Sequence, residues 1–460
     1  MTITVNPLNY HKLGEDLPER PVPEGESEEH VPLGLGVSAG ALENESSLIG
    51  GNADDGDDPS DGPPPKIYGE EMGSYRKRPL IFVPGFGASE LTQLKKVFYR
   101  GRKVIDPSTG EQKRERGLKK WPPVSRDPNN GNWVRQHLQD LNDPDIVTAP
   151  TGLISNFYEE LLNFLRDDLK YSETDTPQTL YTFLYDWTDS NRISGKRLAG
   201  FIAKVVKEFP WPDNTAEEDK VVDVINHSNG GLVTRWAIIK YMSPVNKTVY
   251  LASPHYGASK AYFVLHPDVP INLSDNMIKD LVAEEIWDRF IKDADEDSIK
   301  DEIKLTAQGM DSAFELMPDQ FEFDKSKPPC MTEDGVLFNG WNKTYTQESA
   351  SKFHGASQRK AVKAMNFKLD LGETLPGKIN LVLFSNAKQT KDRINVDVTG
   401  PFYHFEGNPY DSGDKGDGTV PTTSARGPGA AINIPGVDHS GLPNVKTTHY
   451  WIAHFLSKNE

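Results

Sequence analysis

The stretch VVDVINHSNGGLVTRW, residues 221–236, predicts a buried strand, a tight turn at Ser228 and then an amphipathic helix. A serine on a sharp strand-to-helix turn has an exposed hydroxyl group. The N-terminal end of the following helix favours the negative charge that develops in acyl transfer. Such a turn is a nucleophile elbow, so we expect Ser228 to act as a nucleophile in a serine hydrolase or acyltransferase.

The turn differs at one position from the usual pattern G-x-S-x-G. Asn226 stands where the first glycine is usual, whereas Gly230 and Gly231 occupy the far side. Small residues suit the turn because the strand and the helix pass close together, and asparagine tolerates unusual backbone angles better than most residues with a Cβ. The pattern alone is weak, and a chance strand–turn–helix is the alternative. The flanking strand and helix supply the context that the pattern requires.

On this fold an acid and then a histidine follow the serine, each on a loop after a late strand. Residues 416–421 read GDGTVP and place Asp417 in a glycine-flanked turn, after a strand expected at residues 378–384. Residues 432–443 read INIPGVDHSGLP, a short strand and a loop that carries His439. We expect His439 to be the general base and Asp417 to orient its imidazole.

Each of these two assignments has an alternative. An aspartate in a glycine-rich turn is often only a turn residue. The stretch DSGDKGDG, residues 411–418, could also bind calcium, although it lacks the spacing and the closing glutamate of an EF-hand loop. His449 and His454 compete with His439 as the base, but both lie in the expected helix 445–456, where packing is the simpler explanation.

Acyl transfer also needs hydrogen-bond donors for an oxyanion. Residues 79–91 read PLIFVPGFGASEL, a buried strand at 80–83 that ends in a glycine-rich turn. We call this turn, residues 84–87, the oxyanion turn. We expect the backbone amides of Phe86, in this turn, and Asn229, after the nucleophile, to form the oxyanion hole. A plain turn is the alternative.

Several separated segments together resemble the lecithin:cholesterol acyltransferase-like family of lipases and acyltransferases, a branch of the α/β-hydrolases. The resemblance spans about residues 79–456 and rests on the order of short motifs. They are VPGFGAS (83–89), Trp121-Pro122, LYDWTDS (184–190), NHSNGGLV (226–233), LASPHYGAS (251–259), SAFELMP (312–318) and GDGTVP (416–421).

The resemblance implies a Ser–Asp–His triad that acts on the acyl ester of a lipid, with cap insertions that shape an apolar acyl pocket. The chain departs from the family at Thr188, where an arginine usually follows Tyr-Asp-Trp. Cys330 is the single cysteine, so the lid disulfide of secreted animal members cannot form within the chain.

The expected fold is an α/β-hydrolase with a mostly parallel central sheet and helices on both faces. This domain covers residues 76–460, with insertions at about 92–150 and 257–375 that form a cap or lid. Apolar residues at helical spacing predict helices over 153–169, 190–209 and 274–305, and a further helical stretch over 313–323.

Residues 1–75 carry sixteen acidic residues against Lys12, Arg20 and Lys66, a net charge of −13 within the total of −17. With few apolar groups to bury, the segment is expected to be a disordered tail. It contains no stretch that could span a membrane and does not begin like a signal peptide. With one cysteine, this favours a cytoplasmic protein, although export without an N-terminal signal stays open.

A basic stretch lies between the oxyanion turn and Trp121. Its basic residues are Lys95, Lys96, Arg100, Arg102, Lys103, Lys113, Arg114, Arg116, Lys119 and Lys120, opposed by Asp106, Glu111 and Glu115. A solvated face is the simplest interpretation. The stretch could instead touch an anionic membrane surface transiently, with each basic group contributing about 1 kcal/mol, or bind the acidic tail.

The sequence thus predicts a serine lipase, phospholipase or O-acyltransferase that forms an acyl-enzyme on Ser228. Hydrolysis and transfer are not distinguished, because both use the same acyl-enzyme. The alternatives are an esterase for small soluble esters and a catalytically silent α/β-hydrolase that binds lipid or a partner. No metal or dinucleotide motif is present, so no cofactor is expected, and the acidic balance argues against nucleic acid.

Overall fold

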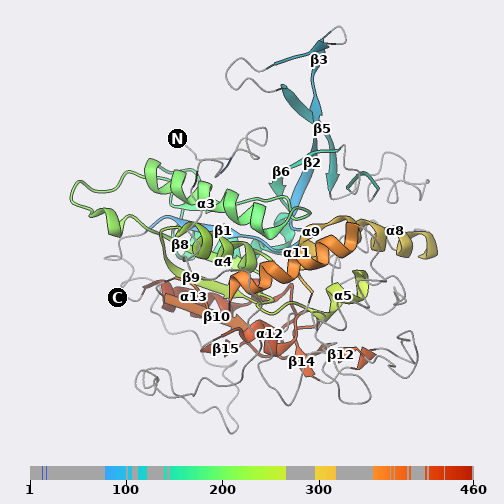
Figure 1. Cartoon of the computed structure of the whole chain (residues 1–460). Coiled ribbons are helices and arrows are strands. Elements are labelled where there is room, and N and C mark those ends of the chain that lie inside the picture. Colours follow the sequence, from blue (N-terminus) through green and yellow to red (C-terminus); the bar gives the residue numbers. More distant parts are fainter. Residues whose placement is uncertain are drawn as a thin grey trace, which may run out of the picture.

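The structure is a computed structural model of the whole chain (Figure 1). It describes Leu13, Leu17 and residues 78–99, 102–105, 112–121, 139–141, 146–265, 296–317, 356–372, 374–377, 379–390, 393–394, 410–411, 414–428 and 430–457.

A six-stranded sheet forms the centre of the molecule, and every neighbouring pair of its strands is parallel. In spatial order the strands are β15 (Ala431–Asn433), β10 (Ile379–Phe384), β9 (Val245–Leu251), β8 (Val222–His227), β1 (Leu80–Val83) and β7 (Leu180–Thr182). The expected α/β-hydrolase fold, with a mostly parallel sheet and helices on both faces, is confirmed. The strands expected at 80–83 and 378–384 correspond to β1 and β10.

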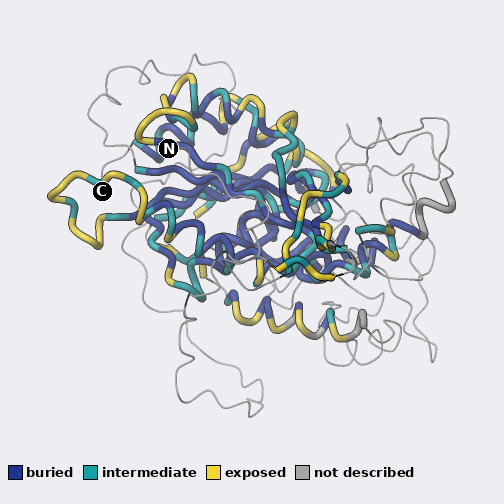
Figure 2. The backbone as a smooth tube through the Cα atoms, turned by 90° about the horizontal axis from the view of Figure 1, so that it is seen from above, coloured by how far each residue is buried: buried dark blue, intermediate teal, exposed yellow. Residues whose placement is uncertain are grey.

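Both faces of the sheet are covered, because successive side chains along a strand point to opposite faces. In β1, Ile81 and Val83 pack into one hydrophobic cluster, whereas Leu80 and Phe82 pack into another. All four residues are fully buried, and Figure 2 colours the central strands as buried. A strand buried on both faces needs the continuous apolar run that its sequence LIFV provides.

Helices α3 (Asn191–Glu208) and α4 (Gly230–Tyr241) supply the apolar residues of the first cluster. Helices α2 (Glu159–Asn163) and α13 (Lys446–Ser457) supply those of the second, on the opposite face. The expected helices at 190–209 and 445–456 are therefore confirmed within one or two residues at each end. Ser190 caps α3 by accepting a hydrogen bond from the amide of Arg192.

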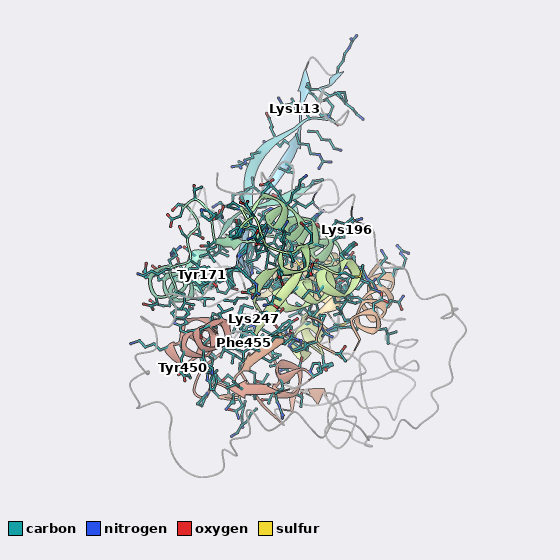
Figure 3. All side chains as sticks on the ribbon, turned by 90° about the vertical axis from the view of Figure 1, so that its left-hand side faces the viewer. Lys113, Tyr171, Lys196, Lys247, Tyr450 and Phe455 are labelled. Carbon is teal, nitrogen blue, oxygen red and sulfur yellow. The ribbon has the colours of Figure 1, made fainter. Side chains whose placement is uncertain are left out.

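A buried lysine ties α13 to the sheet. The Nζ atom of Lys247, on β9, donates to the carbonyl oxygens of Phe455 and Leu456 at 3.1 Å each. Figure 3 shows Lys247 beside Phe455. A cation at the C-terminal end of a helix satisfies carbonyls that have no partner within the helix and complements the helix dipole.

The prediction of a continuous helix over 153–169 is wrong. Leu153 ends strand β6 (Thr148–Leu153), and the amide of Ile154 donates to Ala88, so this part of the chain is extended. A 3-10 turn (Ser155–Phe157), α2 and a π-helical turn (Phe164–Asp168) follow. The apolar residues of this segment were correctly expected to pack in the core. Leu153 and Ile154 are nevertheless extended, because their pairing with residues 88 and 89 after β1 outweighs their helical spacing.

The first insertion contains an antiparallel sheet in the order β5–β2–β6, with β2 at Ser89–Lys96 and β5 at Arg114–Trp121. Beyond it, β3 (Phe98–Tyr99) pairs with β4 (Arg102–Lys103). These strands project from the body of the molecule (Figure 1).

The described part of the second insertion is helical. It comprises α5 (Ser259–Leu265), α8 (Glu296–Gly309), α9 (Asp311–Glu315) and α11 (Ala356–Leu371). Of the helix expected over 274–305, residues 296–305 lie in α8 and the rest lie outside the described residues. The stretch expected at 313–323 is helical only to Glu315, and it is described only to Met317.

Short elements complete the described fold. They are η7 (Glu217–Asp219), β11 (Lys388–Thr390) paired with β14 (Asp414–Gly416), β12 (Arg393–Ile394) paired with β13 (Tyr410–Asp411), α12 (Thr422–Arg426) and η9 (Leu442–Asn444).

Of the acidic segment 1–75, the structure describes Leu13 and Leu17, which pack against the first hydrophobic cluster. The expected disorder of the remaining tail lies outside the described residues. Cys330 and residues 266–295 also lie outside them. None of the helices that the structure describes is long and apolar enough to cross a membrane.

Glu315 joins the second insertion to the body of the molecule. Its carboxylate, on α9, accepts hydrogen bonds from Ser190 Oγ and from the amide of Asn191, each at 2.5 Å, at the start of α3. Burial raises the pKa of Glu315 to about 7, although the hydrogen bonds from Ser190 and Asn191 oppose the shift. A buried carboxyl group thus holds α9 against α3.

We expect Glu315 to make the free energy of unfolding depend on pH. Because the folded-state pKa lies above the ordinary value of 4.5, ionisation opposes folding, and stability falls as pH rises from about 5 to 8. The fall should be about 2 kcal/mol larger in the wild type than in Glu315→Gln. Urea denaturation at both pH values measures it, with Glu159→Gln, at an exposed position on α2, as control. Equal falls in wild type and Glu315→Gln would contradict the expectation.

Candidate functional site

Ser228 lies at the turn between β8 and α4. Its backbone φ of 52° is in the left-handed region, which is uncommon for a residue with a Cβ. The amide of Ser228 donates to the carbonyl of Leu251 on β9 at 2.9 Å, which fixes the turn to the neighbouring strand. The predicted elbow at the carboxyl end of a central strand is therefore present.

Two glycines allow the helix to leave this turn. A Cβ on Gly230 would lie 2.5 Å from the carbonyl oxygen of Pro84, and one on Gly231 would lie 2.2 Å from Ser253 Oγ. Both distances are far below van der Waals contact. The elbow is therefore packed directly against the oxyanion turn on one side and the loop after β9 on the other.

Asn226 fits the position of the first glycine for a different reason from the expected one. It lies in β8 with ordinary strand geometry, so tolerance of unusual backbone angles is not needed. Its buried Oδ1 atom accepts a hydrogen bond from Ser253 Oγ at 3.1 Å. Its Nδ2 atom has no hydrogen-bond partner within the described part of the chain. The asparagine thus links β8 to the loop after β9.

The structure brings Ser228, His439 and Asp417 together in one hydrogen-bonded chain. The distance from His439 Nε2 to Ser228 Oγ is 2.9 Å, and that from His439 Nδ1 to Asp417 Oδ2 is 2.8 Å. Asp417 follows β14 and His439 follows β15, so three loops at the same edge of the sheet contribute one residue each. This is the order and geometry of a nucleophile, a base and an orienting acid.

Asp417 is fully buried. Burial alone would raise the pKa of its carboxyl group, but the charge and hydrogen bond of His439 and the amides of Val420 and Thr419 together lower it. Those amides donate to Oδ1 at 2.7 and 2.9 Å, and His439 occupies Oδ2. The carboxylate is therefore held charged beside the imidazole and has both oxygens engaged.

The loop that carries His439 is also fixed by its backbone. The amide of His439 donates to the carbonyl of Asp417 at 2.9 Å, and Ser385 Oγ donates to the carbonyl of Val437 at 2.6 Å. The His439 side chain is 14% exposed. The imidazole thus faces Ser228 from a braced loop with limited contact with solvent.

The two expected oxyanion donors lie on either side of the elbow. Phe86 is in the turn after β1, and Asn229 is the N-cap of α4. Among the described residues, neither backbone amide has a hydrogen-bond acceptor. By contrast, the neighbouring amide of Gly85 donates to Tyr158 Oη at 2.8 Å. The amides of Phe86 and Asn229 are thus left available to a developing oxyanion.

A buried network that the sequence analysis missed connects the oxyanion turn to the His439 loop. Tyr158 Oη accepts from Gly85 and lies 2.9 Å from His227 Nδ1. His227 Nε2 lies 3.1 Å from the carbonyl oxygen of His439. His227 immediately precedes Ser228, so the network reaches the nucleophile, the oxyanion turn and the base.

The hydrogen bonds of this network determine the protonation of His227. A carbonyl oxygen can only accept, so Nε2 carries the hydrogen, and Nδ1 must accept from Tyr158 Oη. Burial, followed by the nearby charge of His439, lowers the pKa of His227 to about 3. Burial likewise raises the pKa of Tyr158, so its proton is retained. The network is therefore neutral at any pH at which the site would work.

A second buried network supports Asn229. The side-chain amides of Asn191 and Asn229 bond reciprocally, at 3.0 Å and 2.9 Å, and Asn229 Nδ2 also donates to Tyr185 Oη at 3.2 Å. Asn191 begins α3 and donates its own backbone amide to Glu315. The residue after the nucleophile is therefore coupled through α3 to the second insertion.

The rival assignments do not fit the geometry. His449 stacks on Phe164, with ring centroids 4.5 Å apart, and its Nε2 lies 2.9 Å from the carbonyl of Pro443. His454 stacks on Tyr450 in α13.

Thr188, where the resembling family usually has an arginine, donates its hydroxyl to Asp186 at 2.6 Å, a local bond within a turn. Within the described residues no group of three or more histidine, cysteine or acidic side chains could hold a metal ion.

Sequence patterns could have revealed part of what was missed. A histidine directly before the nucleophile was visible in NHSNGG, but its role depends on Tyr158, which carries no recognisable motif. Asn191 follows the LYDWTDS segment and appeared only as the start of a helix. Tyr158 and Asn191 reach the site through hydrogen bonds between residues that are 38 to 73 positions apart in the sequence, and a local pattern does not encode such contacts.

The chain matches no protein-family model and no curated protein sequence. It is similar to the structure of the Tle4-Tli4 complex, with TM-score 0.46 and 14% identity over 82% of this chain and 97% of that chain. The mature lipase BlEst2 of Bacillus licheniformis gives a TM-score of 0.33 and 12% identity, over 83% of this chain and 92% of that chain. Carboxylesterase CesB of Bacillus subtilis gives a TM-score of 0.30 and 8% identity, over 83% of this chain and 85% of that chain. The roles assigned to Ser228, His439 and Asp417 therefore rest on the geometry of the site alone.

Tyr158→Phe should separate catalysis from substrate binding. The change removes the acceptor for Gly85 and the donor for His227, so the oxyanion turn and the His439 loop lose their connection. We expect kcat for a soluble chromogenic ester to fall by roughly ten- to a hundredfold, with KM nearly unchanged.

The matched control is Tyr181→Phe, which removes another buried hydroxyl that bonds a backbone carbonyl, that of Gln178, away from the site. Steady-state kinetics of the two variants make the comparison. If both lose the same activity, the Tyr158 hydroxyl has only a general structural role.

Proposed function

We propose that this chain is a serine hydrolase of lipid acyl esters, related to the lecithin:cholesterol acyltransferase-like family, that works through an acyl-enzyme on Ser228. The observation that carries the proposal is the hydrogen-bonded chain from Ser228 Oγ through His439 to the buried carboxylate of Asp417. Only a nucleophile that must lose a proton needs a base oriented in this way.

In the first half-reaction, Ser228 Oγ attacks the carbonyl carbon of the ester while His439 Nε2 takes its proton. The carbonyl oxygen becomes an oxyanion, for which the amides of Phe86 and Asn229 are the proposed donors. Asp417 stabilises the imidazolium through Nδ1. When the tetrahedral intermediate collapses, the carbon–oxygen bond to the alcohol breaks, and His439 returns its proton to the leaving oxygen.

In the second half-reaction, His439 takes a proton from an incoming nucleophile, which attacks the acyl-enzyme and restores free Ser228. Water gives a fatty acid, and an alcohol gives a new ester. The residues of the site act identically in both cases, so the outcome depends on which acceptor reaches the acyl group. Hydrolysis is the simpler proposal because water needs no binding site of its own.

Two features favour a lipid over a small soluble ester. The order of the short motifs resembles that of a family that acts on lipid esters, and a large helical insertion packs against the core next to the elbow. A substrate series should therefore show turnover that rises sharply once a medium-chain ester exceeds its critical micelle concentration. A smooth saturation curve through that concentration would favour the esterase for small soluble esters.

The assignment of roles is tested by three alanine variants. We expect Ser228→Ala and His439→Ala to lower kcat by something on the order of a millionfold, and Asp417→Ala somewhat less, because the three act as a unit. His449→Ala is the matched control, since His449 bonds only a backbone carbonyl and stacks on Phe164. Loss of activity in His449→Ala but not in His439→Ala would reassign the base.

A fluorophosphonate probe tests the nucleophile independently of the substrate. The adduct, located by mass spectrometry, should lie on Ser228 and be absent in Ser228→Ala. A folded protein that gives no adduct, with and without lipid, would favour the catalytically silent lipid-binding or interaction module.

A further inference from the structure

We infer that the strands projecting from the first insertion form an arm that docks on an anionic lipid surface and brings the site to its substrate. The arm is the stretch 95–118, of which the structure describes residues 95–99, 102–105 and 112–118. The inference rests on the proposed function only for the lipid nature of the substrate. Docking itself is a property of the arm and does not depend on catalysis.

The arm leaves the core at a definite point. Along β2, Leu91 and Leu94 are buried, whereas Lys95 and Lys96 are exposed. From there β2, β5 and the β3–β4 pair continue away from the body, as Figure 1 shows, and Lys113 points outward near the tip in Figure 3. Hydrogen bonds join Val97 to both Val104 and Lys113, at 3.1 and 2.8 Å, so these three backbone segments are bonded to one another.

The arm is basic in a strongly acidic protein. Its sequence holds eight basic and three acidic residues, a net charge of +5, against −17 for the whole chain. Seven of the basic residues are described, and none forms an ion pair with another described residue; they are Lys95, Lys96, Arg102, Lys103, Lys113, Arg114 and Arg116. By contrast, Lys119 and Lys120 at the base of the arm pair with Glu90 and Asp140.

The arm also exposes apolar side chains at the same place. Phe98 is 56% exposed, Ile105 50% and Leu118 43%. Within this small sheet these groups have no core to cover, and strands of so few residues contribute little buried area of their own. Large exposed apolar groups beside unpaired cations suit the boundary between lipid head groups and acyl chains.

Strand register places several of the cations beside one another and one of the apolar groups beside a cation. Phe98 lies opposite Lys103, and Ile105 is two residues beyond Lys103, so these three share a face. Lys96 is two residues before Phe98 and lies opposite Arg114.

Arg116 lies two residues beyond Arg114 and therefore belongs to the same face as Lys96. The described acid of the arm, Glu115, is opposite Lys95 on the other face. Register thus brings cations of β2 and β5 together and sets Phe98 beside Lys103 in the β3–β4 pair, whereas the described carboxylate, Glu115, lies on the other face of β5.

The base of the arm is bonded to the catalytic region. Trp121, the last residue of β5, donates its indole N–H to the carbonyl of Gly87 at 2.7 Å in the oxyanion turn. Trp121 also packs edge-on against Trp187, which contacts Phe86 with ring centroids 4.7 Å apart. The base of the arm is therefore joined directly to the turn that carries a proposed oxyanion donor.

Two other occupants, the acidic segment 1–75 and nucleic acid, would satisfy the charge of the arm. Neither needs Phe98, Ile105 and Leu118 at an exposed tip. A lipid surface uses both features, because head groups attract the cations and the acyl region takes up the apolar side chains. The combined surface therefore favours an anionic bilayer.

Vesicle flotation of the full chain carrying Ser228→Ala tests docking without hydrolysis. The vesicles are phosphatidylcholine with and without phosphatidylglycerol. Lys96→Gln/Arg114→Gln/Arg116→Gln removes three cations from the arm, and Phe98→Ser removes an apolar group. The matched control is Lys196→Gln/Lys204→Gln/Lys207→Gln on α3, which changes net charge equally away from the arm. Far-UV circular dichroism and thermal melting of the same variants check their folding independently of catalysis.

We expect tight binding to the anionic vesicles, weakened on the order of a hundredfold by the arm triple variant and little by the control triple variant. Phe98→Ser should weaken binding by roughly tenfold. Raising salt should release the parent protein more steeply than the arm variant.

The proposal is wrong if the parent protein does not bind anionic vesicles, or if the two triple variants lose binding equally. Tighter, arm-dependent binding to duplex DNA would assign the arm to nucleic acid instead. Carbodiimide cross-links between arm lysines and residues 1–75, without vesicle binding, would assign it to the acidic segment. Absence of an adduct on Ser228 would contradict the proposed function and leave the docking result unaffected.

Discussion

The close approach of α4 to the ends of β1 and β9 is the constraint on which the site depends. The chain must reverse at Ser228 with a left-handed backbone, and the helix must begin at once against the carbonyl of Pro84. Only glycine fits at 230 and 231. Because the oxyanion turn is pressed against the start of the helix, the nucleophile and the two candidate oxyanion amides are positioned by one packing contact.

Buried polar groups then connect this contact to the remainder of the site. Tyr158 and His227 join the oxyanion turn to the His439 loop, and Asn191 joins Asn229 to α3 and Glu315. Each group is neutral or has its charge satisfied, which is the condition for a polar network in a core. The cost of leaving any member unpaired holds the loops in one arrangement.

The two insertions stand in different relations to this core. The helical insertion shares the first hydrophobic cluster through residues such as Phe314 and Met317 and is part of the packed body. Among the described residues, the arm contributes none of its own side chains to this cluster and joins it at its base, beside Leu91, Leu94 and Trp121. The arm extends beyond this core and exposes apolar side chains beside cations that form no ion pair with another described residue, which is the basis for proposing that it docks on a lipid surface.

Local sequence patterns were sufficient to predict the units around the nucleophile. Apolar runs bounded by glycine predicted β1, β8 and the elbow, and motif order predicted that Ser228, Asp417 and His439 would meet. These depend on short-range patterns, which neighbouring residues encode. The break of residues 153–169 into an extended segment and short turns depends on tertiary contacts, since Leu153 pairs with Ser89 on another strand. The presence of Tyr158 and Asn191 at the site depends on tertiary contacts as well, because a buried hydrogen bond between distant residues leaves no periodic trace in either segment.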